Sequence, residues 1–402
     1  MKGIVSMSEA NENREHPEAS AGAEPLSRKA DMYGIYLHVP FCVRKCPYCD
    51  FYSVASGAGR RAEFLRALGN QIVSFPAVDA DTVYFGGGTP SLLSPDEIAG
   101  VLSILRGHHR ISKDAEVSME CNPATVTVQT LREYRGAGVN RISIGCQSFQ
   151  PHLLKRLGRL HSDEEAVRTV TDAREAGFDN ISIDLMLGIP DATPETTLAD
   201  ARAAVSLPVD HVSAYILKIC EGTPFADGVP GIPDDDVQAE CYLTFSSFLT
   251  ENGFSQYEIS NFARSGKECR HNRKYWSCGQ WLGYGPAAHM SDGGNRYSYP
   301  RDLQRFIREY RDGPVSAPLS SFRHEGVVDA EEMVMLGLRT SDGISLEAVR
   351  RRFGWELNAS QNAFLTQCER GGLVRRQGDL LRLTREGFLV SNSVLSELFL
   401  LN

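Results

Sequence analysis

Short apolar runs alternate with amphipathic stretches through the first half of the chain. Six runs are rich in β-branched and aromatic residues: "GIYLHV", "TVYFG", "EVSME", "RISIG", "ISIDLML" and "HVSAYIL". The stretches between them have helical features, since "SPDEIAGVLSILRG" opens on capping residues and ends on glycine. The alternation predicts an α/β fold built from βα units, and six strands favour an open, partial (β/α)6 barrel over a closed barrel of eight.

The pattern changes after residue 230 and again near residue 330. Residues 231–329 are assigned to a segment that covers the barrel. In it, the expected helix "DDDVQAECYLTFSSFLTENG" leads into residues 254–290, which are dense in aromatic residues, glycine and polar residues and which we expect to bear a site and to form no regular layer. Residues 330–402 indicate three helices, the hairpin "LVRRQGDLLRLT" and another helix, an order that resembles a winged helix. Residues 1–32 are polar without an apolar period, which predicts a disordered extension. The barrel is then assigned to residues 33–230.

Composition narrows the classes of partner. The 402 residues carry a net charge of -9, and residues 330–402 hold equal numbers of basic and acidic residues, so we expect no nucleic-acid partner. No apolar run reaches the roughly 20 residues of a membrane span, and the N-terminus lacks the apolar core of a signal peptide. We therefore expect a cytoplasmic protein, in which the ten cysteines are free, metal-bound or catalytic.

Three of these cysteines follow the first predicted strand in the stretch "CVRKCPYCD". Cys42, Cys46 and Cys49 have the spacing C-x3-C-x2-C, whereas structural zinc sites use four ligands. Three thiolates on a [4Fe–4S] cluster leave one iron without a protein ligand, where a substrate's amino and carboxylate groups can bind. The alternatives are a zinc site that takes a distant fourth cysteine, or three incidental thiols. With Tyr48 before the last cysteine, the spacing resembles the signature of the radical S-adenosylmethionine (SAM) superfamily.

Polar residues and glycines follow the later strands. Gly86, Gly87 and Gly88 end the second strand in "YFGGGTPSLL", where missing side chains let the backbone approach a ligand, although a glycine turn alone is weak evidence. The next three strands end at Glu120, Gln147 and Asp184. Because parallel strands of a barrel end at one mouth, we expect these side chains to converge on one site there.

Residues 33 to 402 resemble the anaerobic coproporphyrinogen III oxidase family, and within it the HemW subfamily of haem chaperones. The motifs are "IYLHVPFCVRKCPYCDF", "FGGGTPSLL", "ECNPATVT", "GCQSFQPHLLKRLGRLH", "IDLMLGIP", "ECRHNRKYW" and "RLTREGFLVSNSVLSELF". The resemblance implies that Cys42, Cys46 and Cys49 hold the cluster and that SAM contacts Tyr36, Gly87, Gly88, Thr89 and Glu120. Positions matching Tyr48, Gln147, Arg159 and Asp184 bind a second SAM or line the substrate side in the oxidases.

Three departures separate the chain from the oxidases. Phe51 stands where they carry a fourth cysteine, residues 1–32 show no pattern for their structured N-terminal arm, and "HNRKYW" matches the H-N-x-x-Y element associated with haem binding. His271 and Tyr275 are spaced i and i+4, so on a helix they share a face, and either residue type ligates haem iron. The alternative is that this segment only packs against the barrel. Cys220 in "LKICEGTPF" replaces an expected acidic residue and has no assigned role.

The resemblance implies a protein that binds haem and delivers it to apo-haemoproteins, with the cluster and SAM gating or assisting transfer. The second hypothesis is a radical SAM enzyme acting on a tetrapyrrole, such as an oxygen-independent coproporphyrinogen III oxidase. Phe51 and "HNRKYW" favour the first. The oligomeric state, including a homodimer, stays open.

Overall fold

The computed structural model describes residues 32–55 and 57–401, so the predicted N-terminal extension lies outside the described residues apart from Met32. The six predicted strands form neighbouring parallel strands of one sheet in chain order. They are β1 (Tyr33–Val39), β4 (Asp79–Gly87), β5 (Arg110–Cys121), β6 (Arg141–Gln147), β7 (Ile181–Leu187) and β8 (His211–Ile216). The predicted α/β class and partial barrel are confirmed.

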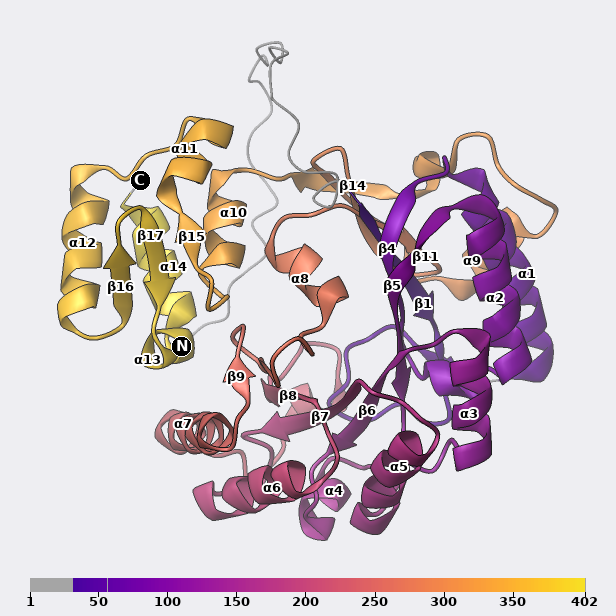
Figure 1. Cartoon of the computed structure of the whole chain (residues 1–402), viewed down its shortest axis with the longest axis horizontal. Coiled ribbons are helices and arrows are strands. Elements are labelled where there is room, and N and C mark those ends of the chain that lie inside the picture. The colour runs from indigo at the N-terminus through magenta and orange to yellow at the C-terminus, as the bar shows by residue number, and fades with distance from the viewer. Residues whose placement is uncertain (1–31, 56, 402) are drawn as a thin grey trace.

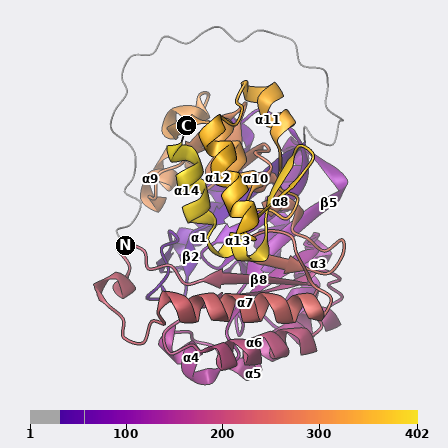
Figure 2. The same cartoon turned by 90° about the vertical axis from the view of Figure 1, so that its left-hand side faces the viewer.

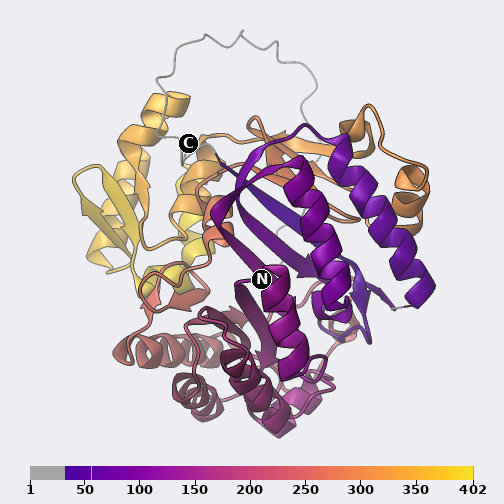
Figure 3. The same cartoon turned by 45° about the vertical axis from the view of Figure 1, so that its right-hand side comes forward.

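Helices cover the outer face of this sheet, as the indigo to magenta helices in Figures 1 and 3 show. They are α1 (Ala58–Ser74), α2 (Pro95–His108), α3 (Val128–Ala137), α4 (Pro151–Arg156), α5 (Asp163–Glu175) and α6 (Pro194–Ser206). Four of them begin in capping boxes, in which the cap hydroxyl and the third helical residue satisfy each other's backbone N–H groups. On α2 the pair is Ser94 and Glu97, within the predicted cap sequence.

The sheet continues beyond the barrel on both edges. After α7 (Asp235–Glu251), β9 (Ser255–Gln256) and β10 (Asn261–Ala263) add to β8 in antiparallel order. At the opposite edge, β11 (Trp281–Tyr284) pairs parallel with β1, followed by β12 (His289–Asp292), β13 (Asn295–Ser298) and β14 (Arg323–Val327). The helix expected at residues 234–253 corresponds to α7. The expectation that residues 254–290 form no regular layer is wrong, because β9 to β12 extend the sheet through backbone pairing and leave little apolar periodicity.

One short helix joins the two edges. The chain leaves β10, forms α8 (Arg270–Trp276) and enters β11, so "HNRKYW" lies on this connection. The backbone N–H groups of Arg270 and His271 both donate to Glu116 on β5, each at 3.1 Å. A Cβ added to Gly34 on β1 would lie 3.0 Å from the His271 ring. Helix α8 therefore closes the end of the barrel where the parallel strands begin, and we call it the floor (Figure 1).

The C-terminal module has the three predicted helices and the predicted hairpin, but two helices follow the hairpin where one was predicted. Helices α10 (Ala330–Gly337), α11 (Leu346–Phe353) and α12 (Ala359–Arg370) precede the hairpin of β16 (Val374–Gln377) and β17 (Leu380–Leu383), and β15 (Ile344–Ser345) pairs with β17. The two helices after the hairpin are α13 (Arg385–Leu389) and α14 (Ser391–Leu400). Helix α9 (Leu303–Tyr310), which precedes the module in the chain, packs against α1 on the barrel. Figure 2 shows the module above α7. Arg385 on α13 donates a hydrogen bond of 2.9 Å to Ser247 Oγ on α7. The domain boundaries themselves stay a prediction.

Among the described helices, none combines the length and apolar character that a membrane crossing requires.

Candidate functional site

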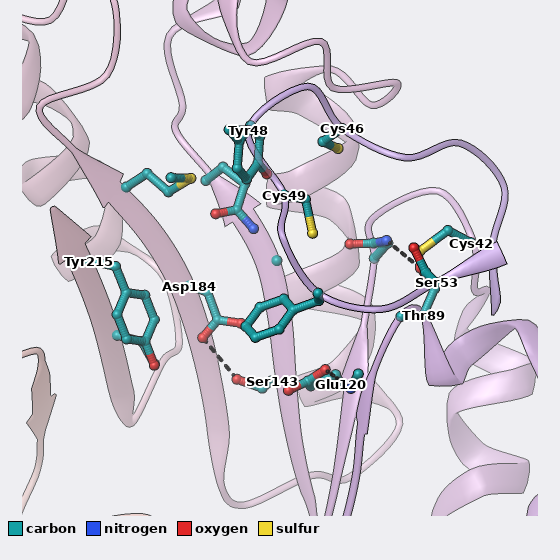
Figure 4. Close-up of a pocket in the computed structure, with 18 of the residues that line it drawn as sticks. Cys42, Cys46, Tyr48, Cys49, Ser53, Thr89, Glu120, Ser143, Asp184 and Tyr215 are labelled. Carbon is teal, nitrogen blue, oxygen red and sulfur yellow. Dashed lines mark hydrogen bonds between the residues drawn. The ribbon is translucent and has the colours of Figure 1, made fainter. Parts of the chain in front are cut away.

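The cysteine loop runs from β2 (Phe41–Cys42) to β3 (Val54–Ala55), two short parallel strands that pair at its base. All three cysteines are free and partly exposed. Cys42 Sγ lies 3.5 Å from Thr89 Oγ1, and the Cys49 N–H donates to the Cys46 carbonyl at 3.1 Å. Figure 4 shows the three thiols on this loop, above the ends of the barrel strands. Burial raises the pKa of the Cys49 thiol.

A cavity of about 390 Å³ extends from the cysteine loop into the barrel interior. Eleven of the fourteen predicted site residues line it: Cys42, Cys46, Tyr48, Cys49, Gly87, Gly88, Thr89, Glu120, Gln147, Arg159 and Asp184. Tyr36, His271 and Tyr275 do not. The prediction that polar groups at successive strand ends share one mouth therefore agrees with the geometry.

The glycine turn packs tightly against the end of β1 and the start of β2 (Phe41–Cys42). Gly87 has φ +109°, and a Cβ there would lie 2.6 Å from the His38 ring. A Cβ on Gly88 would lie 2.6 Å from the Phe41 carbonyl oxygen. Both glycines are required by the folding of the turn, whatever binds beside it. A larger residue at Gly87 would first displace His38, so its effect on a ligand would be indirect.

Glu120 and Asp184 are the two carboxylates of the cavity. Glu120 accepts hydrogen bonds from the Tyr84 hydroxyl at 3.0 Å and the Gly87 N–H at 3.1 Å. Burial, followed by repulsion from Asp184, raises the pKa of Glu120 from 4.5 to about 7. Asp184 accepts from Ser143 Oγ at 3.0 Å, as Figure 4 shows, and burial raises its pKa as well. Because the pKa of Glu120 is near neutral pH, a cationic amino group bound in this cavity would favour the ionised form of its carboxylate.

Arg159 links the cysteine loop to the strand ends. Its Nη2 donates to Asn122 Oδ1 at 2.8 Å and to the Gly145 carbonyl at 2.9 Å, and its Nη1 lies 3.6 Å from Cys46 Sγ. Asn122 Nδ2 in turn donates to Thr89 Oγ1 at 3.0 Å. The guanidinium therefore places a fixed positive charge beside the thiols, which favours an anionic group there.

Tyr36 lies one layer below the mouth. Its hydroxyl is 3.1 Å from His38 Nδ1, and its ring stacks on that of Tyr84. A Cβ added to Gly86 would meet both the Tyr36 ring at 3.0 Å and Glu120 Oε1 at 3.1 Å. Tyr36 thus supports the residues that line the cavity without lining it itself.

His271 and Tyr275 lie on one face of α8, as their spacing predicts, but at the floor of the barrel. His271 Nε2 is 2.7 Å from the Tyr275 hydroxyl, and its Nδ1 is 2.8 Å from Thr82 Oγ1. The side chain is fully buried, and burial together with Lys274 lowers its pKa to about 3, so the imidazole is neutral. Both ring nitrogens are engaged. Haem ligation by either residue stays a prediction, and it requires these hydrogen bonds to break.

The sequence analysis missed several residues that line the cavity: Tyr84, Asn122, Arg141, Ser143, Ser213, Tyr215 and Asn272. Strand alternation was the available signal for some of them. Arg141, Ser143 and Gly145 alternate along β6 and so share the face that lines the cavity, ahead of the register shift between Ile144 and Gln147. Asn272 could not be found this way, because its place depends on α8 crossing the floor.

The donor set fits an iron–sulfur cluster. Among the residues with described positions, no three Cys, His, Asp or Glu side chains are arranged around a single metal ion. A cubane takes each thiolate on a different iron, so its ligands do not need to converge on one point. Three free thiols on one loop, with the Arg159 guanidinium beside Cys46, suit such an anionic cluster.

Comparison with known proteins identifies two family models in the chain. Residues 36–204 match the Radical SAM superfamily, and residues 328–390 match the HemN C-terminal domain. The chain is 36% identical to the heme chaperone HemW of Mycobacterium tuberculosis over 96% of its own length and 99% of that protein. It is 36% identical to the heme chaperone HemW of Escherichia coli, with 92% and 99% covered.

A solved structure is also similar. Coproporphyrinogen III oxidase (HemN) from Escherichia coli, described as a radical SAM enzyme, superposes with a TM-score of 0.77 over 92% of this chain and 91% of that one. The sequence identity is 21%, so the similarity concerns the fold.

Proposed function

The chain belongs to the HemW family of radical SAM proteins, and from this we propose that it binds haem and delivers it to apo-haemoproteins. The observation that carries the proposal is the similarity to heme chaperones named HemW along nearly the whole chain, C-terminal module included. Phe51, which is 64% exposed, adds support because it stands at the position where the oxidases carry a fourth cysteine.

The radical SAM domain implies a [4Fe–4S] cluster and SAM. We assign the cluster to Cys42, Cys46 and Cys49, and the SAM site to the glycine turn, Thr89 and Glu120, with Tyr36 behind them. When bound, the reduced cluster supplies the electron that cleaves SAM. In this assignment the Arg159 guanidinium, beside Cys46, compensates the negative charge of the thiolates. Glu120 accepts a hydrogen bond from the amino group of SAM.

Haem transfer can use the cluster and SAM as a gate. The cysteine loop covers the cavity, and it is tied to the barrel through Cys42 with Thr89 and Cys46 with Arg159. Ligation of an iron–sulfur cluster would fix this loop, because all three thiolates would then be held by one rigid group. We propose that cluster and SAM occupancy set the position of the loop and so control whether haem is released.

A second candidate function is radical chemistry on a tetrapyrrole. The observation that favours it is the cavity itself, which continues below the predicted SAM layer to Arg141 and Asn272 and leaves room for a substrate group. The fold shared with coproporphyrinogen III oxidase is compatible with it. The same cavity serves either function.

One experiment separates the two functions. Anaerobically reconstituted protein is incubated with SAM and dithionite, together with either haem or coproporphyrinogen III. We expect a stable haem complex that transfers haem to an apo-haemoprotein, and little 5′-deoxyadenosine beyond the amount formed without substrate. Stoichiometric 5′-deoxyadenosine with loss of carbon dioxide from coproporphyrinogen III would overturn the chaperone proposal.

A further inference from the structure

Arg141 is a buried cation whose guanidinium is only partly engaged by its neighbours. It is the first residue of β6, and 2% of it is exposed. Its Nε has no hydrogen-bond partner. Glu116, Glu120 and Asp184 attract the guanidinium electrostatically, but none of these described carboxylates forms an ion pair with it. Arginine stays charged in proteins, and a buried charge is costly unless something pairs with it. The side chain lines the cavity of the candidate site.

The carboxylate at the same level of the barrel is already in use. Glu116 on β5 accepts the N–H groups of Arg270 and His271, and Cys269 Sγ lies 3.6 Å from it. These bonds fix the start of α8. Glu116 contributes a favourable field to Arg141 but makes no ion pair with it. The guanidinium therefore keeps donors that can point into the cavity.

The position of Arg141 relative to the predicted SAM layer follows from the strand register. Ser143 pairs with Glu120, so Arg141 lies two residues deeper on the same strand face, roughly 7 Å along the strand. Asn272 on α8 and Ser213 on β8 line the same cavity. Ser213 pairs with Asp184 in the strand register and bonds to it, so the donors left for a further carboxylate are those of Arg141 and Asn272.

The outer part of the cavity has a different character. Phe51, Tyr215 and Ile216 line it and are 64%, 43% and 36% exposed. We call these three residues the apolar rim, which shares the entrance with the exposed charged residues Arg44, Lys45, Asp50 and Lys218. An apolar rim above a buried cation suits a ligand with an apolar body and a carboxylate arm.

We propose that Arg141 and Asn272 bind a propionate of the tetrapyrrole. This inference rests on the proposed function, which supplies the tetrapyrrole. It assigns haem recognition to a propionate in the barrel interior, and it gives the Asn of "HNRKYW" a direct contact while His271 and Tyr275 hold the floor.

The test compares haem with its dimethyl ester, in which both propionates are blocked. Binding is titrated by absorption to the reconstituted protein and to its Arg141→Met, Arg141→Lys and Arg132→Met variants. Arg132 is the matched control, since it lies on α3 in a half-exposed ion pair with Glu175. We expect the unmodified protein and Arg132→Met to prefer haem over the diester by about 10- to 100-fold, the effect of a charge-assisted hydrogen bond.

Arg141→Met should lose this preference while its affinity for the diester stays unchanged, and Arg141→Lys should keep part of it. Equal weakening of both ligands in Arg141→Met would show that the arginine only supports the fold and would overturn the inference. Equal binding of haem and diester by the unmodified protein would overturn it while leaving haem delivery intact. Failure of the unmodified protein to bind either ligand would overturn the proposed function as well.

A carboxylate could also come from SAM. Equilibrium dialysis of the same proteins with labelled SAM distinguishes this source. Loss of one bound SAM per chain in Arg141→Met, with haem binding intact, would assign the guanidinium to SAM and overturn the propionate. We expect SAM stoichiometry to be equal in Arg141→Met and Arg132→Met.

Discussion

At the mouth of the barrel, polar side chains line open space, whereas at the floor they bond to one another. The three thiols are partly exposed and border the cavity. His271 is fully buried with both ring nitrogens engaged, and Glu116 is taken up by the start of α8. Both ends carry residue types that bind cofactors. Unused bonding capacity beside a cavity distinguishes a ligand site from a structural network.

The largest expected effect lies at the mouth. Cys46→Ala should remove the cluster, because two thiolates cannot retain it, so iron should fall from about four per chain to near zero. Iron analysis and the visible absorption of anaerobically purified protein measure this. Cys368→Ala on α12 is the control, since Cys368 is buried in the C-terminal module.

Cys220→Ala sharpens the same comparison. Cys220 also lines the cavity but lies outside the cysteine loop, and we expect its replacement to leave the iron content unchanged. Iron loss as complete as in Cys46→Ala would mean that the assigned ligand set is wrong.

At the floor we expect a loss of stability. His271→Ala leaves the Thr82 and Tyr275 hydroxyls without their partner and opens a void, which should lower the free energy of unfolding by about 2 to 4 kcal/mol. Tyr275→Phe removes one hydrogen bond and should cost about 1 kcal/mol. Chemical denaturation measures both, and iron content should match that of the unmodified protein.

The haem spectrum of the same two variants tests the comparison directly. If α8 is a floor, Tyr275→Phe should bind haem with an unchanged absorption spectrum. A changed spectrum in both variants at unchanged stability would instead make this helix the source of the axial ligand.

The smallest expected effect concerns the pH dependence of stability. The pKa of Glu120 is raised from 4.5 to about 7, mainly by burial. The folded protein therefore keeps a proton that the unfolded chain releases above pH 4.5, and stability falls as pH rises through 7. Between pH 4.5 and 8, unmodified protein should lose roughly 2 to 3 kcal/mol relative to Glu120→Gln. Glu258 also has a pKa of about 7 but is present in both proteins, so it cancels. A constant difference across this range would contradict the buried, protonated state.

Much of the barrel could be predicted because its strands are long and buried. Runs such as "RISIG" and "ISIDLML" are rich in β-branched and aliphatic residues, are largely buried on both faces and are separated by capped helices. The position of the candidate site could also be predicted, because all six strands are parallel and their carboxyl ends must meet at one mouth of the barrel. The strands β9 to β14 left too little pattern, since several have only two to four residues.

The surroundings of individual side chains were beyond the reach of the sequence. Helical spacing showed that His271 and Tyr275 share a face, but not that this face points to Thr82 and the closed end of the barrel. Arg141 was overlooked because it begins a strand, and residues at the N-terminal ends of barrel strands usually serve stability. Its lack of an ion pair depends on Glu116 being occupied by a segment about 150 residues away.

The place of α8 between β10 and β11 also determines how the protein can be made on the ribosome. Until residues 281–284 have emerged, β1 lacks its neighbour β11, and β8 is exposed until residues 261–263 have emerged. The nascent six-stranded sheet therefore passes through a stage with two unpaired edges, each able to pair with another chain. Completion of α8 and β11 covers the second edge, so the "HNRKYW" segment marks the point in synthesis at which both long barrel edges are paired and the edges of the sheet pass to shorter strands, finally β9 and β14.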